Sequence, residues 1–188
     1  MNNYIKVFTI AVLISMSACG PKKNDAKEQA EEQNEAKFDD TRVERDAEFA
    51  VAAADGGLLE VELGKLAQSN AASTQVKSFG KMMMDDHSKA NAELKTLAAS
   101  KGIQLPAVLS EKNQKKFNDL ADKSGKDFDD AYTDFMVKDH KEDIDEFQKE
   151  AEKGRDPELK SWAAGKVAVL EHHLQMAKQA EEAVDNMK

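Results

Sequence analysis

Cysteine is nearly missing from this chain of 188 residues, because Cys19 is the only one. An internal disulfide is therefore impossible, and a zinc site built from several cysteines is excluded. The chain also has only 3 prolines and 9 glycines, and aromatic residues make up 6% of it. Few helix breakers and few aromatic residues favour helices over strands. We therefore expect an all-α fold.

Positive charge is scarce as well. Lysine and arginine number 27 against 36 aspartates and glutamates, which gives a formal net charge of −9. An acidic protein is a poor candidate for binding nucleic acid or an anionic membrane through charge. We therefore expect no nucleic-acid partner. The net negative charge is expected to serve either simple solubility or the attraction of cations.

The first 18 residues have the layout of a secretory signal. Lys6 supplies the basic start, and residues 7–14 form an apolar run that is too short to span a membrane comfortably. Small residues then lead to Cys19. We predict a signal peptide over residues 1–18.

The end of this segment, Ser17-Ala18-Cys19, resembles the lipobox of bacterial lipoproteins, with Met16 where leucine is usual. We predict that Cys19 is lipidated and anchors an exported protein to the bacterial envelope, on the periplasmic face. Gly20 favours the outer membrane, because it is not the aspartate linked with inner-membrane retention in some bacteria. An ordinary signal peptide with an incidental cysteine is the alternative.

The rest of the chain divides into a tether and a domain. Residues 19–39 hold almost no large apolar side chain before Phe38, so they are predicted to form a flexible, partly helical, acidic tether. Residues 40–188 show helical periodicity and are predicted to form one antiparallel four-helix bundle. A short extra helix lies between the second and third long helices, where the longer link could permit a crossover. The helices are expected at 41–69, 73–101, 110–123, 127–153 and 157–184.

Three of the four histidines lie on the apolar stripes of different long helices. They are His87, His140 and His173. Glu60, on the first long helix, has a glycine four residues away on either side, which leaves space for its carboxylate beside the core. Metal and cofactor sites of helical bundles are built in the interior from facing helices. The pattern predicts a polar cluster that could bind a transition metal.

Methionine and acidic residues accompany these histidines. A methionine lies three or four residues from each one, on the same helix face, and thioethers favour Cu(I). Carboxylates nearby could act as ligands or orient the ring nitrogens. These neighbours are Met83, Met136, Met176, Asp86, Asp139, Asp143 and Glu171.

Known catalytic patterns are not found. A di-iron carboxylate bundle needs Glu-x-x-His on two helices, and none of the residues three positions before a histidine is acidic. The sequence has no phosphate-binding loop and no nucleophile elbow. An enzyme with an atypical metal centre is thus the least favoured hypothesis. The main alternative to metal binding is a structural or protein-interaction module of the envelope, whose histidines only specify packing.

Several runs resemble one bacterial family in order along the chain. They are residues 49–67 (FAVAAADGGLLEVELGKLA), 79–87 (FGKMMMDDH), 127–129 (DFD) with Tyr132 and His140, 156–160 (DPELK) and 170–174 (LEHHL). This pattern is similar to domain of unknown function 4142 over about residues 45–182. The resemblance implies a ferritin-like four-helix bundle with Glu60, His87, His140 and His173 as its polar positions. It assigns no role to His172 and supplies no reaction.

Overall fold

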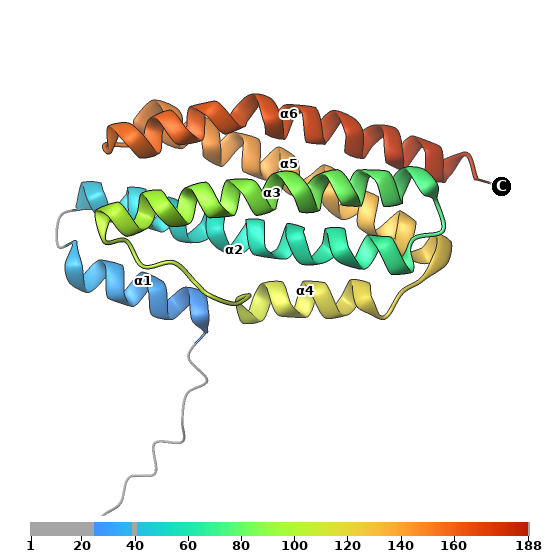
Figure 1. The fold of residues 1–188 in the computed structure, drawn as a ribbon, viewed down its shortest axis with the longest axis horizontal. Helices are drawn as coiled ribbons and strands as arrows, with labels where there is room; N and C mark the ends of the chain where they lie inside the picture. Colours follow the sequence, from blue (N-terminus) through green and yellow to red (C-terminus); the bar gives the residue numbers. More distant parts are fainter. Residues whose placement is uncertain (1–24, 39–40, 188) are drawn as a thin grey trace, which may run out of the picture.

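The computed structural model describes residues 25–38 and 41–187, and within them it has six helices and no strand (Figure 1). The predicted all-α fold is confirmed. Four of the helices are long and lie side by side, while two shorter ones cover one face of the group (Figure 1). The helices are α1 (Ala26–Lys37), α2 (Thr41–Asn70), α3 (Thr74–Lys101), α4 (Glu111–Ala121), α5 (Gly125–Lys153) and α6 (Pro157–Asp185).

The long helices pack as two hairpins. Helix α2 packs on α3, and α5 packs on α6. A short turn joins the two helices of each hairpin, so their chains run in opposite directions (Figure 1). We call α2 with α3 the first hairpin and α5 with α6 the second hairpin.

The connection between the two hairpins extends along the length of the bundle (Figure 1). After α3 ends, the chain passes along the bundle through α4, and α5 then runs in the same direction as α3 (Figure 1). Helix α4 contacts both α2 and α5 on the way.

The helix ends lie where the sequence places their caps. Ser73 and Ser110 each accept backbone N–H bonds at the start of a helix, and Asp156 does the same at the start of α6. Gly102 ends α3 with a φ of 68°, a left-handed conformation that glycine adopts without strain. These local signals explain why the observed bounds follow the predicted ones closely.

Three buried aspartates hold the connections in place. Asp129 on α5 accepts two backbone N–H bonds from the turn between α2 and α3. Asp55 on α2 accepts from both the N–H and the hydroxyl of Ser110, just before α4. Asp46 on α2 accepts two backbone N–H bonds from the turn between α5 and α6. Each connection is therefore fixed to a helix that is distant in sequence.

The two helices of the first hairpin approach closely at a pair of glycines. A Cβ atom on Gly64 would lie 2.5 Å from the carbonyl oxygen of Gly80. A Cβ atom on Gly80 would lie 2.6 Å from the Cβ of Ala67. Neither glycine can carry a side chain unless the helices separate, so the pair determines how near α3 lies to α2.

The predicted tether contains helix α1, which packs on α2. Its Ala30 and Asn34 are buried. The Asn34 side chain both donates to and accepts from the backbone of Gln104, at 2.9 and 2.7 Å. Lys37 of α1 also donates to the carbonyl oxygen of Gly102 at 2.7 Å. Composition alone did not indicate these contacts, because α1 makes them largely through polar side chains rather than through an apolar stripe.

The predictions for residues 1–18 and for Cys19 lie outside the described residues. Within the described part of the chain, none of the helices combines the length and the apolar character that a membrane crossing requires.

Candidate metal centre

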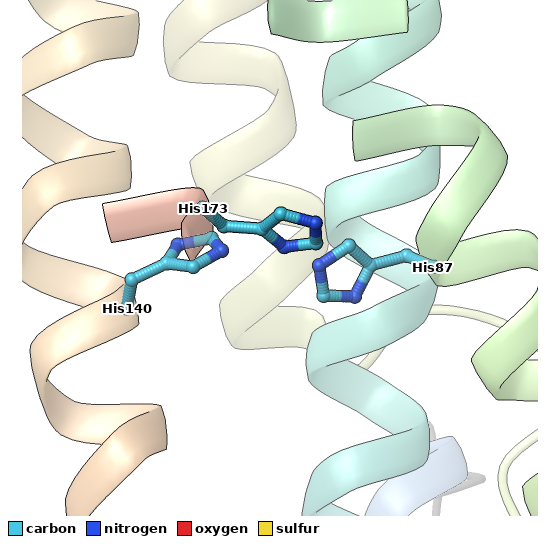
Figure 2. Close-up of side chains that lie close together, drawn as sticks. All are labelled: His87, His140 and His173. Atoms are coloured by element: carbon cyan, nitrogen blue, oxygen red, sulfur yellow. The ribbon is translucent and has the colours of Figure 1, made fainter. Parts of the chain in front are cut away.

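Three histidines from three helices meet in the interior of the bundle (Figure 2). His87 comes from α3, His140 from α5 and His173 from α6, and their exposed fractions are 7%, 0% and 1%. The ring centroids lie 5.2 to 5.9 Å apart. One nitrogen of each ring lies within 4.8 Å of the corresponding nitrogens of the other two. The structure thus brings together the three histidines that the sequence singled out.

Each of these rings has an oxygen partner for one nitrogen. An imidazole N–H directed at such an oxygen fixes both the tautomer and the orientation of the ring. The partners come from three different helices and lie at hydrogen-bond distance. They are Glu60 Oε2 at 2.7 Å from His87 Nδ1, the Met136 carbonyl oxygen at 3.0 Å from His140 Nδ1, and Asp86 Oδ2 at 2.9 Å from His173 Nε2.

The second nitrogen of each ring has no hydrogen-bond partner among the described residues. These atoms are the Nε2 of His87, the Nε2 of His140 and the Nδ1 of His173. When the first nitrogens donate to their oxygen partners, the second ones carry lone pairs. Three unpaired lone pairs buried in a bundle core are costly, because a buried polar atom without a partner destabilises a fold by about 1–3 kcal/mol.

Burial keeps the three rings neutral. It lowers the pKa of His87 to about 4 and the pKa of His140 to about 3. The pKa of His173 is also lowered, because burial outweighs the attraction of Asp86. All three imidazoles are therefore uncharged at neutral pH, which is the form that binds a metal ion.

Glu60 on α2 lies against two of these rings. Its side chain is almost fully buried, and burial raises its pKa to about 8. While Oε2 contacts His87, Oε1 lies 3.5 Å from His140 Nε2 and has no hydrogen-bond partner in the described part of the chain. Of the two glycines beside it in the helix, Gly56 faces open space and Gly64 faces α3.

Glu60 also belongs to a second group, made of carboxylates. Oxygens of Glu60, Asp139 and Asp143 lie within 4.8 Å of one another. Burial, with Glu60 next in effect, raises the pKa of Asp139 to about 8, and the same causes raise the pKa of Asp143 well above its usual value. The sequence placed both aspartates beside His140, but their contact with Glu60 across the helices was not predicted.

A cavity of about 120 Å³ reaches this region from between the two hairpins. Polar lining comes from Glu60, His87, Asp143 and His173, with Lys89 and Lys166 also on the cavity wall. The aromatic side chains of Phe147 and Trp162 are among its other walls. Gly56 borders the same space, where an added Cβ would meet nothing within 4 Å. The site is therefore accessible to small ligands on one side.

The other predicted neighbours lie elsewhere. His172 is exposed on α6, beside the buried His173. Met83 and Met136 are fully buried in the apolar core, and Met176 packs against that core. Glu171 is exposed. Asp86 contributes to the site through His173 on another helix, rather than through its sequence neighbour His87.

Comparison with known families gives one match. Residues 26–180 match the family described as a domain of unknown function (DUF4142). The chain matches none of the curated proteins and none of the solved structures with which it was compared. The matched region includes every residue of the histidine and carboxylate groups.

Proposed function

The chain belongs to the DUF4142 family, and we propose that it binds a transition-metal ion through His87, His140 and His173. The observation that carries this proposal is the set of three unpartnered ring nitrogens, buried and close together in the core. Neutral imidazole is a ligand that zinc, copper, iron and nickel all accept. An ion between the rings would engage all three lone pairs at once.

The oxygen partners of the rings support the same proposal. Histidines that ligate metals almost always donate their other N–H to a carboxylate, a backbone carbonyl or water. Here Glu60, Asp86 and the carbonyl of Met136 occupy those positions. Each ring is thus held in a defined orientation by one nitrogen, which leaves the other nitrogen free to bind an ion.

Three protein ligands leave a tetrahedral ion with a fourth position for water or another ligand. The cavity that His87 and His173 line supplies space for it. We assign the site to metal storage, buffering or stress protection. The net charge of −9 favours the accumulation of cations around the protein.

We further propose that the fold is ferritin-like. Ferritin-like bundles combine two helical hairpins with one long crossover connection. The passage through α4 and the common direction of α3 and α5 support this assignment (Figure 1).

We also propose that the protein is an envelope lipoprotein anchored through Cys19, as the lipobox-like sequence indicates. Incorporation of labelled palmitate into the parent, and its loss in Cys19→Ser, would support this assignment. A parent that remains unlabelled and leaves the membrane fraction in high salt would refute it.

The metal proposal is tested by elemental analysis of the protein purified without a histidine tag and without chelators. His173→Gln and His140→Gln should lose a near-stoichiometric metal, because each removes one ligand. His172→Gln is the matched control, since it changes an exposed histidine next to His173 on the same helix, and it should keep the metal. Circular dichroism establishes that all variants remain helical.

The opposite result is equally clear. A parent protein that holds no metal, even after reconstitution with copper, zinc, iron and manganese, would refute the proposal. The histidines would then serve packing, and the structural or protein-interaction module of the envelope would become the leading interpretation.

A further inference from the structure

A second set of possible ligands lies next to the histidines and differs from them in chemistry. Glu60, Asp139 and Asp143 each offer an oxygen within 4.8 Å of the other two. Two oxygens on opposite sides of one ion lie about 4.2 Å apart around Mg²⁺ and about 4.8 Å apart around Ca²⁺. The three oxygens therefore lie within the span of one Ca²⁺-sized ion, and a smaller ion would draw them somewhat closer together.

We propose that Glu60, Asp139 and Asp143 bind a second, harder divalent cation of the Mn²⁺ or Mg²⁺ class, so that Glu60 links it to the histidine site. Binding of a cation by the carboxylates does not require an ion at the histidines. The link that Glu60 makes between two bound ions, however, rests on the proposed function. Oxygen ligands select magnesium, calcium and manganese, whereas imidazole selects zinc, copper, iron and nickel. The two sites would therefore hold different metals.

The two oxygens of Glu60 differ in their surroundings. Oε2 is engaged by His87 Nδ1 at 2.7 Å. Oε1 is buried in a side chain that is 1% exposed, lies 3.5 Å from His140 Nε2 and has no hydrogen-bond partner among the described residues. Burial of a carboxylate oxygen without a donor is unfavourable. A cation beside Oε1 would supply the missing partner.

The positions of the two aspartates fit this assignment. Asp139 and Asp143 are four residues apart on α5, so their side chains lie on one face of that helix. The Glu60 carboxyl group contacts His87 and His140, and these rings are neutral, so they bring it no positive charge. A divalent cation would take the place of the protons on these carboxyl groups and would offset the repulsion between the carboxylates once they are ionised across α2 and α5.

The cavity supplies the remaining coordination positions. Glu60 and Asp143 both line the space of about 120 Å³ that opens between the hairpins. Mg²⁺ and similar ions usually keep several water ligands and use few carboxylates. This space is large enough for such waters and also gives the ion a way in.

The test is a Mn²⁺ titration of the full chain after one equivalent of Zn²⁺ has been bound, followed by electron paramagnetic resonance. Zinc content is measured on the same samples. The Zn²⁺-loaded parent should bind one further Mn²⁺. Asp139→Asn and Asp143→Asn should weaken that Mn²⁺ binding by about tenfold or more, while both keep the zinc. Asp145→Asn is the matched control, because it removes an exposed carboxylate from the same helix, and it should bind Mn²⁺ as the parent does.

The failure of each proposal gives a different result. A Zn²⁺-loaded parent that binds no Mn²⁺ refutes the second site and leaves the histidine site intact. The second site is also refuted if Asp145→Asn weakens Mn²⁺ binding as much as Asp139→Asn and Asp143→Asn do, since only surface charge would then be acting. A chain that takes up Mn²⁺ but never zinc, copper, iron or nickel would refute the histidine site and keep the carboxylate site.

Discussion

Two alanine substitutions in one helix are expected to change stability in opposite directions. Gly56 and Gly64 are eight residues apart in the interior of α2. Replacing glycine with alanine in a helix interior gains about 1 kcal/mol, because alanine loses less backbone entropy on folding. The two positions share this gain, so any difference between the variants comes from packing.

The surroundings of the added methyl group decide the sign. At Gly56 the new Cβ meets nothing within 4 Å, so Gly56→Ala should raise the free energy of unfolding by about 1 kcal/mol. At Gly64 the Cβ would lie 2.5 Å from the carbonyl oxygen of Gly80 and 3.0 Å from the backbone nitrogen of Met84. Backbone atoms cannot turn aside as a flexible side chain does, so α2 and α3 must separate.

Overpacking of this kind costs about 1–3 kcal/mol, which offsets or exceeds the gain from alanine. Gly64→Ala should therefore be less stable than Gly56→Ala by about 1–3 kcal/mol. In a chain of this size that difference corresponds to about 2–4 °C in Tm for each kcal/mol. Thermal and urea unfolding followed by circular dichroism measure it. Equal stability of the two variants, or a more stable Gly64→Ala, would refute the close approach of the two helices.

Three other predictions concern buried polar groups. Tyr132→Phe should leave the free energy of unfolding unchanged or slightly higher in urea denaturation, because the buried hydroxyl has no hydrogen-bond partner among the described residues; a loss above about 1 kcal/mol would reveal a missed partner. Asp129→Ala should lower the same free energy by about 1–3 kcal/mol, because the N–H groups of the turn between α2 and α3 lose their acceptor; an unchanged midpoint would contradict this. Metal-free protein should lose stability as the pH rises from about 6.5 to 8. In the folded state Glu60 and Asp139 keep their protons up to about pH 8, while the unfolded chain releases them near pH 4. Denaturation with a chelator present at several pH values measures this slope, and a rise in stability over that range would contradict it.

Local signals made most of the fold predictable. Ser73, Ser110 and Asp156 satisfy backbone N–H groups at the first turn of a helix, and Gly102 ends one, whatever packs around them. Helix α1 was not predicted as a packed element, because its hydrogen bonds to the rest of the fold run from Asn34 and Lys37 to the distant backbone of Gly102 and Gln104. A contact between residues so far apart in sequence has no local pattern.

The candidate site was predictable to a similar degree. His87, His140 and His173 lie on the apolar stripes of their helices, so their inward position follows from periodicity alone. Their partners did not follow from it. The pairing of Asp86 with His173 depends on how far α3 and α6 are shifted relative to each other along their axes. That shift is set by the packing of whole hairpins rather than by residue spacing.

The division of the bundle into two hairpins has a consequence for assembly. The first hairpin holds His87, and the second holds His140 and His173. Neither hairpin alone contains all three histidines of the proposed metal site, so that site exists only when the two hairpins are docked. The free energy of binding an ion is then also free energy of docking. Removal of the ion should therefore loosen the contact between the hairpins before it unravels either one, and amide hydrogen exchange should rise first along the faces where they meet.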